Sequence, residues 1–327
     1  LKAVLFAYCV LHGVNPHEVS FGLHAILVDS LIRGAYGFAN GGDALAERYV
    51  ERIKANGGEV HLRKRVQKIE TRNKAVQAVI TEDGQRFEAQ WVISGIHPKA
   101  TFSIVDTPNV FTPAFRSRLE RIKETPGIFG VYAKCRESSG FDPRKNYYFF
   151  GSLEANEMMR PTSPEARPST VFISPAQRNE PQPKALNIHA ISPLEWFAPW
   201  SNTSFGKRPA AYNELKSKYA GQVLEFVDEF APGFKDRLEA FATSTPVTNL
   251  HFNGSLEGSP YGIYHSIENT GARALGPATH VTNLLITGQS SLFPGLLGAA
   301  VSALRTSGYI IGIKPVLKEL REQGAMA

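Results

Sequence analysis

Apolar residues recur every three or four positions in three stretches of the chain: residues 20–33, 43–56 and 212–230. This spacing places the apolar side chains on one face and predicts three amphipathic helices. The pair Gly57-Gly58 is positioned to end the second of them. A further apolar run, residues 1–14, carries one Lys and is followed by no small-residue cleavage site. It therefore predicts a buried helix rather than a secretory signal.

Short β-rich runs lie between these helices. The runs 66–71, 75–81 and 86–88, with Asp83-Gly84 as a hairpin turn, predict a small antiparallel meander. Residues 91–93 are continuously apolar, which is typical of a strand buried on both faces. Other strands are predicted at 59–62, 127–133, 147–150, 170–174, 186–191 and 283–287.

The C-terminal region combines a predicted strand, a Gly/Pro loop over residues 288–295 and a helix that begins at about Leu296 and runs to about Gly312. Small residues crowd the first turns of this helix. An uncapped helix N-terminus with free N–H groups can receive an anionic or electron-rich ligand. The alternative is that the small residues only let the helix pack closely on a sheet, and the residues alone leave both interpretations open.

Composition narrows the class of protein. The chain has 327 residues, 43% of them apolar and 20% charged, which is the balance of a soluble globular protein of two domains or one large composite domain. The net charge of +6 is spread along the chain without a basic tract interleaved with aromatics, so we expect no nucleic-acid partner. Residues 274–304 carry no charge, but prolines and glycines interrupt them, and no transmembrane helix is expected.

The cysteine and histidine residues form no motif that indicates a specific chemistry. Cys9 and Cys135 cannot form a disulfide framework, a thiolate metal site or a CxxC redox pair, so a reducing, cytoplasmic compartment is the expectation. His251, His265 and His280 match no zinc spacing, and we expect no metal site. A GxSxG nucleophile motif is absent, and no catalytic acid or base stands out, so the catalytic residues stay unknown.

The segments Thr287-Gly288-Gln289 and Pro294-Gly295-Leu296-Leu297-Gly298 resemble the C-terminal flavin-binding motif of the phytoene desaturase family. They are most similar to the branch that contains retinol saturases and carotenoid isomerases, in which Gln often replaces Asp after the first glycine, as Gln289 does here. Residues 36–98 resemble the middle block of the same family.

The resemblance implies an α/β fold, in which an FAD/NAD(P)-binding-like domain lacks its N-terminal Rossmann turn and carries an inserted substrate domain on a mixed or antiparallel sheet. Val66 would meet the adenine of FAD through its backbone, and Gly288 and Gln289 would lie by the ribityl and pyrophosphate. The isoalloxazine would lie over the stretch Pro294, Gly295, Leu296, Leu297 and Gly298. The implied segments are 1–36 (helical part of the substrate region), 37–100 (first FAD half), 101–245 (substrate domain) and 246–327 (second FAD half).

The chain departs from the family in one respect. None of its 28 glycines forms the GxG pair that a GxGxxG dinucleotide fingerprint requires. We therefore expect it to be a truncated or separately encoded piece, roughly 150–200 residues short of a complete flavoenzyme. Its chemistry would be desaturation, saturation or isomerisation of a polyene or isoprenoid lipid with FAD, which the chain alone need not bind. The alternative is a non-catalytic lipid- or subunit-binding protein.

Three aromatic residues are candidates for lining an apolar substrate tunnel: Tyr148, Phe149 and Trp196. Ordinary core packing explains adjacent aromatics equally well. The resemblance also leaves open a complementary N-terminal half or a second copy of the chain as partner. The expected location is cytoplasmic. Because polyene substrates dissolve in membranes, contact of the chain with a membrane surface is left open as well.

Overall fold

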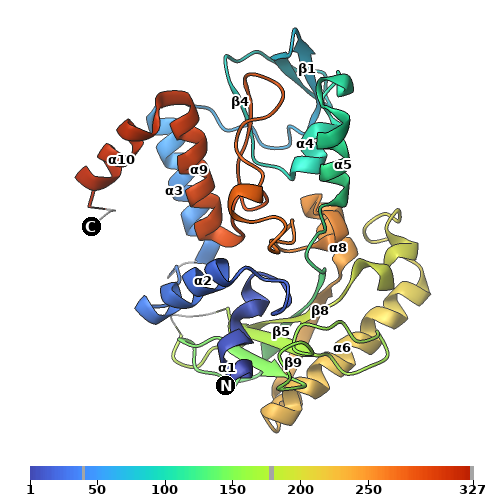
Figure 1. The fold of residues 1–327 in the computed structure, drawn as a ribbon. Helices are drawn as coiled ribbons and strands as arrows, with labels where there is room; N and C mark the ends of the chain where they lie inside the picture. Colours follow the sequence, from blue (N-terminus) through green and yellow to red (C-terminus); the bar gives the residue numbers. More distant parts are fainter. Residues whose placement is uncertain (39–40, 177–179, 325–327) are drawn as a thin grey trace. The chain divides into compact units, whose positions relative to one another are not determined.

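The chain folds into two compact units, each assembled from two separate stretches. The computed structural model describes all residues except 39–40, 177–179 and 325–327. Unit 1 comprises residues 1–52 and 124–260, and unit 2 comprises 53–123 and 261–327 (Figure 1). Both units contain helices and strands, which confirms the predicted α/β class. The functional assignment of the four segments stays a prediction.

Unit 1 is built on a five-stranded antiparallel sheet with the strand order β6-β7-β8-β5-β9. The strands predicted at 127–133, 147–150, 170–174 and 186–191 are all present, whereas β9 was not predicted. β9 is an edge strand whose residues are mostly exposed, so it lacks the apolar alternation that reveals a strand. The strand bounds are β5 Ile128–Cys135, β6 Tyr147–Phe150, β7 Thr170–Pro175, β8 Ala185–Ile191 and β9 Leu238–Ser244.

One face of this sheet packs against the long helix α6, Ala210–Phe230. Side chains alternate along each strand, so Phe129 and Val131 of β5 enter this core together with Ile188 of β8. The buried hydroxyl of Tyr219 on α6 donates a hydrogen bond to the Ile191 carbonyl at 2.8 Å. After residue 124, unit 1 also contains the helices η3 Leu194–Trp196, η4 Ala198–Trp200, α7 Phe234–Arg237, α8 Pro246–Asn253 and η5 Leu256–Gly258.

The N-terminal stretch of unit 1 is helical but differs from the expectation at its start. The predicted buried helix is wrong: α1 (Lys2–Phe6) has no buried residue, and η1 (Ala7–Leu11) buries only Cys9. Apolarity alone reports a tendency to leave water and does not supply a surface to pack on. The helices predicted over 20–33 and 43–56 are confirmed as α2 (Phe21–Arg33) and α3 (Gly41–Ala55).

Unit 2 contains a meander and a pair of parallel strands. The antiparallel sheet β1-β2-β3 confirms the predicted meander, and β10 pairs with β4 in parallel. The strand predicted at 59–62 is absent, because this exposed run has no partner strand among the residues that the structure describes. The bounds are β1 Val66–Arg72, β2 Ala75–Thr81, β3 Arg86–Phe87, β4 Val92–Ser94, α4 Pro98–Ser103, η2 Pro108–Val110, α5 Pro113–Arg121, η6 Gly271–Arg273, β10 Leu284–Ile286, α9 Gly295–Ile311 and α10 Ile313–Glu322.

β4 is more open than its sequence predicts. Ile93, at its centre, is 47% exposed, so the expectation of a strand buried on both faces is wrong. By contrast β10 is fully buried, with Leu284 and Ile286 in the core of unit 2. Among the described helices, none is long and apolar enough to cross a membrane.

Asn283 joins the meander to the parallel strand pair. Its side-chain oxygen accepts a hydrogen bond from the Val76 amide at 2.6 Å, and its side-chain nitrogen donates to the carbonyls of Val76 and Gln90 at 3.1 and 3.0 Å. Because Asn283 directly precedes β10, these bonds fix where that strand, and the loop after it, begins.

We expect Asn283→Ala to lower the local opening free energy of β2 by about 2–3 kcal/mol, because three hydrogen bonds are lost and their backbone partners are left without them. Native-state hydrogen exchange of the Val76 amide measures this change. Gln77→Ala is the matched control, since the Gln77 side chain bonds only to the carbonyl of Ala75. Equal exchange rates of the Val76 amide in the two variants would show that the Asn283 hydrogen bonds do not stabilise β2.

Candidate functional site

The loop that connects β10 to α9 is closed on itself by short-range bonds. Gly288 and Gly295 have φ values of 97° and 77°, which favour glycine. The side-chain oxygen of Gln289 accepts a hydrogen bond from the Gly295 amide at 3.2 Å, and the Ser291 amide donates to the Gly288 carbonyl at 3.2 Å. The loop therefore has a defined shape that begins and ends at residues expected to hold a cofactor.

Helix α9 meets the rest of unit 2 through small and hydroxyl-bearing residues. Its only buried residues are Gly298, Ser302 and Thr306, spaced four apart on one stripe. The Ser302 hydroxyl bonds to the hydroxyls of Thr287 and Ser291, and Thr306 donates to the Ile286 carbonyl at 3.2 Å. The helix is thus fixed to β10 and its loop by hydroxyl hydrogen bonds.

Gly298 brings the helix backbone against the loop. A Cβ added at this position would lie 2.0 Å from the Phe293 carbonyl oxygen, which is far inside van der Waals contact. Only glycine therefore permits this approach of helix to loop. The small residues consequently serve close packing, which was one of the two interpretations that the sequence left open.

A second segment of unit 2, which contains Gly262 and His265, packs against the loop over 288–295. The ring nitrogen Nε2 of His265 lies 3.0 Å from the Gln289 carbonyl and donates to it, and His265 is buried. A Cβ on Gly262 would lie 2.1 Å from the Ser290 hydroxyl oxygen. Sequence reasoning treated His265 as structural and did not find that it positions Gln289, because the two are 24 residues apart with no motif between them.

The first turn of α9 is open to a ligand. Pro294 is the N-cap and offers no side-chain cap, while Leu296 and Leu297 are 58% and 64% exposed. A Cβ on Gly295 would meet nothing within 4 Å. The positive end of the helix dipole is therefore presented beside a loop without charged residues, which suits an electron-rich ring system such as a flavin. The residues present thus fit the cofactor expected from the sequence.

Val66 lies elsewhere in unit 2. It is the first residue of β1, pairs with Thr81 and has a half-buried side chain. It belongs to the meander and not to the loop over 288–295, and its contact with the adenine stays a prediction.

The face of the unit 1 sheet opposite α6 carries a row of aromatic rings. Tyr148, Phe172, His189 and Tyr132 lie on neighbouring strands β6, β7, β8 and β5. Successive ring centroids are 5.1, 6.1 and 6.1 Å apart. Burial lowers the pKa of His189, so its imidazole is neutral at pH 7. The row forms a partly exposed aromatic surface.

The three predicted substrate-lining residues fall on different sides of this sheet. Tyr148 belongs to the aromatic row, whereas Phe149 stacks on Phe230 of α6 at 4.8 Å and Trp196 packs on Tyr219 at 5.2 Å. Adjacent strand residues point to opposite faces, so Tyr148 and Phe149 cannot line the same surface. On its face of the sheet, the Tyr148 ring meets the ring of Tyr8 edge-on at 5.9 Å, and the substrate-lining roles of all three residues stay predictions.

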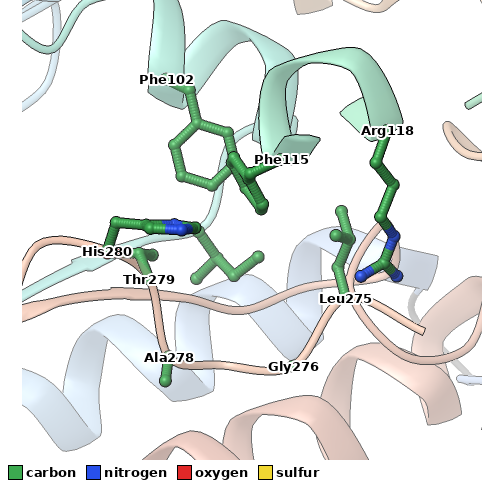
Figure 2. Close-up of a pocket in the computed structure, with 9 residues that line it drawn as sticks. Phe102, Phe115, Arg118, Leu275, Gly276, Ala278, Thr279 and His280 are labelled. Carbon is green, nitrogen blue, oxygen red and sulfur yellow. The ribbon is translucent and has the colours of Figure 1, made fainter. Parts of the chain in front are cut away.

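Unit 2 also contains a pocket of about 290 Å³ that sequence reasoning did not find. Figure 2 shows Phe102, Phe115 and His280 grouped at one end and Arg118 at the other. The Phe115 and His280 rings lie 4.6 Å apart, and the Arg118 guanidinium already donates to the Arg273 carbonyl. None of the residues expected to contact the flavin lines this pocket, which has the full lining Phe102, Phe115, Arg118, Leu275, Gly276, Ala278, Thr279, His280 and Ile286.

Comparison with known proteins gives the family. The profile described as flavin containing amine oxidoreductase matches residues 12–310. All-trans-retinol 13,14-reductase of Danio rerio is 27% identical over 95% of this chain and 55% of its own length, and the Homo sapiens protein of that name is 23% identical over the same shares. An inactive all-trans-retinol 13,14-reductase of Danio rerio is 24% identical, covering 88% of this chain and 51% of its own.

Among solved structures, a putrescine oxidase variant with redesigned cofactor binding aligns with a TM-score of 0.53 at 15% identity, covering 79% of this chain and 50% of that one. This likeness shows the fold. The resemblance to the retinol saturase branch is confirmed by the curated relatives. The chain spans about half the length of those relatives.

We expect Gly298→Ala to destabilise the loop by about 1–3 kcal/mol or more, because the added methyl group must displace the backbone of Phe293. Exchange of the Ser291 amide, which reports loop closure, measures the effect. Gly221→Ala is the matched control: Gly221 also lies inside a helix, has open space at its Cβ, and should gain about 0.5–1 kcal/mol. Protection of Ser291 that survives in Gly298→Ala would show that the contact is dispensable.

Proposed function

Since this chain belongs to the flavin containing amine oxidoreductase family, we propose that it is the C-terminal portion of an FAD-dependent oxidoreductase that acts on a carbon–carbon double bond of a retinoid-like polyene. The observation that carries this proposal is the open first turn of α9 beside the closed loop over 288–295. The names of the curated relatives support the retinoid class of substrate.

In this proposal unit 2 holds the flavin. FAD, when bound, supplies the hydride-transfer chemistry. Gly288 and Gln289 form the entry to the loop, and the amides at the start of α9 face the ring system with their positive dipole end. His265 holds the Gln289 carbonyl by a hydrogen bond, and the side chain of Gln289 closes the loop onto Gly295.

Unit 1 supplies the apolar surface for the polyene. A conjugated chain is flat and hydrophobic, and the aromatic row of Tyr148, Phe172, His189 and Tyr132 offers neighbouring rings across four strands. Burial lowers the pKa of His189, so the row carries no charge at pH 7. Tyr132 is 44% exposed and its hydroxyl bonds to Ser244 at 3.1 Å, which leaves a polar end to the surface.

Unit 2 has open surface that suits a complementary N-terminal half. β4 pairs with β10 on one edge, and no strand pairs with its other edge among the described residues. Ile93 of β4 and Ile96 after it are exposed, and so are Tyr309 and Ile311 of α9 in the same unit. A parallel strand added to β4 would satisfy its unpaired backbone groups. The alternative occupant is a second copy of the chain.

The proposal includes a location in a reducing compartment with peripheral membrane contact. Val4 and Leu5 of α1 and Phe21 of α2 are exposed apolar residues on the N-terminal stretch. Exposed apolar side chains of this kind can enter the interface of a membrane in which a polyene is dissolved.

We expect the chain alone to retain FAD at well below one molecule per chain, because no GxGxxG turn is present to hold the pyrophosphate. Co-expression with the GxGxxG-containing N-terminal half of a retinol reductase relative should bring FAD to about one per complex, measured by flavin absorbance. Gly295→Val in the same complex should lower the FAD content, with Gly221→Ala as control. A stable complex that contains no flavin would refute the proposal.

In that complex we expect Tyr148→Ala to lower kcat/KM for all-trans-retinol by about 3- to 10-fold, the equivalent of one aromatic contact, with unchanged flavin content. Phe149→Ala is the matched control on the adjacent position. Because Phe149 packs against α6, its truncation should lower the thermal stability of unit 1 instead. An unchanged kcat/KM in Tyr148→Ala would remove the aromatic row from the substrate site.

A second function is favoured by two observations. The chain carries no GxGxxG turn, and one relative is named an inactive reductase. Both suit a non-catalytic lipid- or subunit-binding protein that has the same fold. Retinoid binding by the chain in the absence of flavin, with no turnover in the reconstituted complex, would support this reading over the enzyme.

A further inference from the structure

Three metal-ligating side chains converge inside the N-terminal stretch of unit 1. Cys9 comes from η1, His12 follows that helix directly, and His24 lies in the first turn of α2. They are 0%, 1% and 7% exposed, respectively. One ligand atom from each lies within 4.8 Å of the other two. The proposed flavin and polyene contacts do not involve them.

Two of the three distances between these atoms match those around a tetrahedral metal ion. The sulfur of Cys9 is 3.7 Å from Nδ1 of His24, and Nε2 of His12 is 3.2 Å from the same nitrogen. Zinc bonds of about 2.3 Å to sulfur and about 2.0–2.1 Å to nitrogen place sulfur and nitrogen about 3.6 Å apart and two nitrogens about 3.3 Å apart at tetrahedral angles. The third pair, Cys9 and His12, lies within 4.8 Å, so a small shift of one side chain completes the spacing for an ion.

The outer contact of His24 also suits a metal ligand. Its second ring nitrogen, Nε2, donates a hydrogen bond to the Leu5 carbonyl at 2.7 Å. This bond fixes the tautomer in which Nδ1 carries a lone pair aimed at Cys9 and His12, which is the usual orientation of ligating histidines. The Nδ1 atom of His12 accepts a hydrogen bond from the Val14 amide at 3.3 Å. When Nε2 of His12 binds an ion, the ring proton lies on Nδ1, and this long hydrogen bond is lost.

We propose that Cys9, His12 and His24 form a site for a thiophilic closed-shell metal ion, Zn²⁺ or Cu⁺. Thiolate and imidazole are the ligands that these ions prefer. Binding converts the Cys9 thiol to a thiolate and releases one proton per ion to solvent, while both histidines bind in their neutral form. One thiolate neutralises Cu⁺ fully, whereas Zn²⁺ leaves one positive charge and a fourth position for water.

The site would organise the N-terminal stretch. α1, η1 and the start of α2 have few buried side chains, and Cys9 and His24 are among them. An ion held by residues on both sides of the 13–20 connection would cross-link η1 to α2. In the absence of an ion, burial raises the pKa of the Cys9 thiol to about 12, so the thiol is uncharged and the three groups are hydrogen bonded to one another.

Cobalt titration of the tag-free, chelator-treated chain tests the proposal without flavin or substrate. We expect one Co²⁺ per chain, with a thiolate-to-cobalt charge-transfer band and the visible bands of tetrahedral cobalt. Zn²⁺ should displace the cobalt, and an anaerobic titration against a colorimetric Cu⁺ chelator should separate the two ions. X-ray absorption of the zinc- or copper-loaded chain should give one sulfur and two nitrogen ligands.

Matched variants locate the site. Cys9→Ala should weaken binding by at least about 100-fold, because loss of even an outer contact of a ligand costs about 10- to 100-fold. Cys135→Ala, which removes the other buried thiol, should leave the titration unchanged. A folded chain that binds no cobalt, or a charge-transfer band that survives in Cys9→Ala, would overturn the proposal. If Cys9→Ala does not fold, a loaded wild-type chain whose metal has no sulfur ligand overturns it equally.

Discussion

The close approach of the α9 backbone to the Phe293 carbonyl is the contact on which the site in unit 2 depends. Gly298 permits it because a Cβ at this position would lie only 2.0 Å from the Phe293 carbonyl oxygen. The hydroxyls of Ser302 and Thr306 continue the same stripe and bond to the loop and to β10. The loop is therefore held between a strand and a helix, and the first turn of α9 is left facing outward.

This arrangement reverses the usual amphipathic helix. The inward stripe of α9 is small and polar, while Leu296, Leu297 and Tyr309 are exposed. Apolar side chains left in water on a helix of this length favour covering by a cofactor or by another segment of protein. The free edge of β4 points to the same need, since unpaired strand edges invite a partner strand. The proposed flavin and complementary half would satisfy both.

In unit 1 the alternation of side chains along each strand gives the sheet two different faces. Residues that face α6 form a closed core, and their neighbours on the same strands form the aromatic row from Tyr148 to Tyr132. The N-terminal stretch follows a different rule. Its small buried set contains the polar and sulfur-bearing side chains Cys9, His12 and His24 beside the apolar Val14, Val19 and Leu23. A metal ion would cross-link the first three.

The sequence by itself determined the elements with local signals: helices 21–33, 41–55 and 210–230, the β1–β2–β3 meander, and the strand, loop and helix that end in the small-residue stripe. Hydrophobic period and turn residues are local properties, so they could be read without the fold, and the flavin-type motif lies within one short segment. Tertiary structure alone decided that Tyr148 and Phe149 face opposite ways, that His265 holds Gln289, and that Cys9 meets His24. These contacts join residues distant in sequence or depend on which sheet face is covered, and no local pattern encodes either.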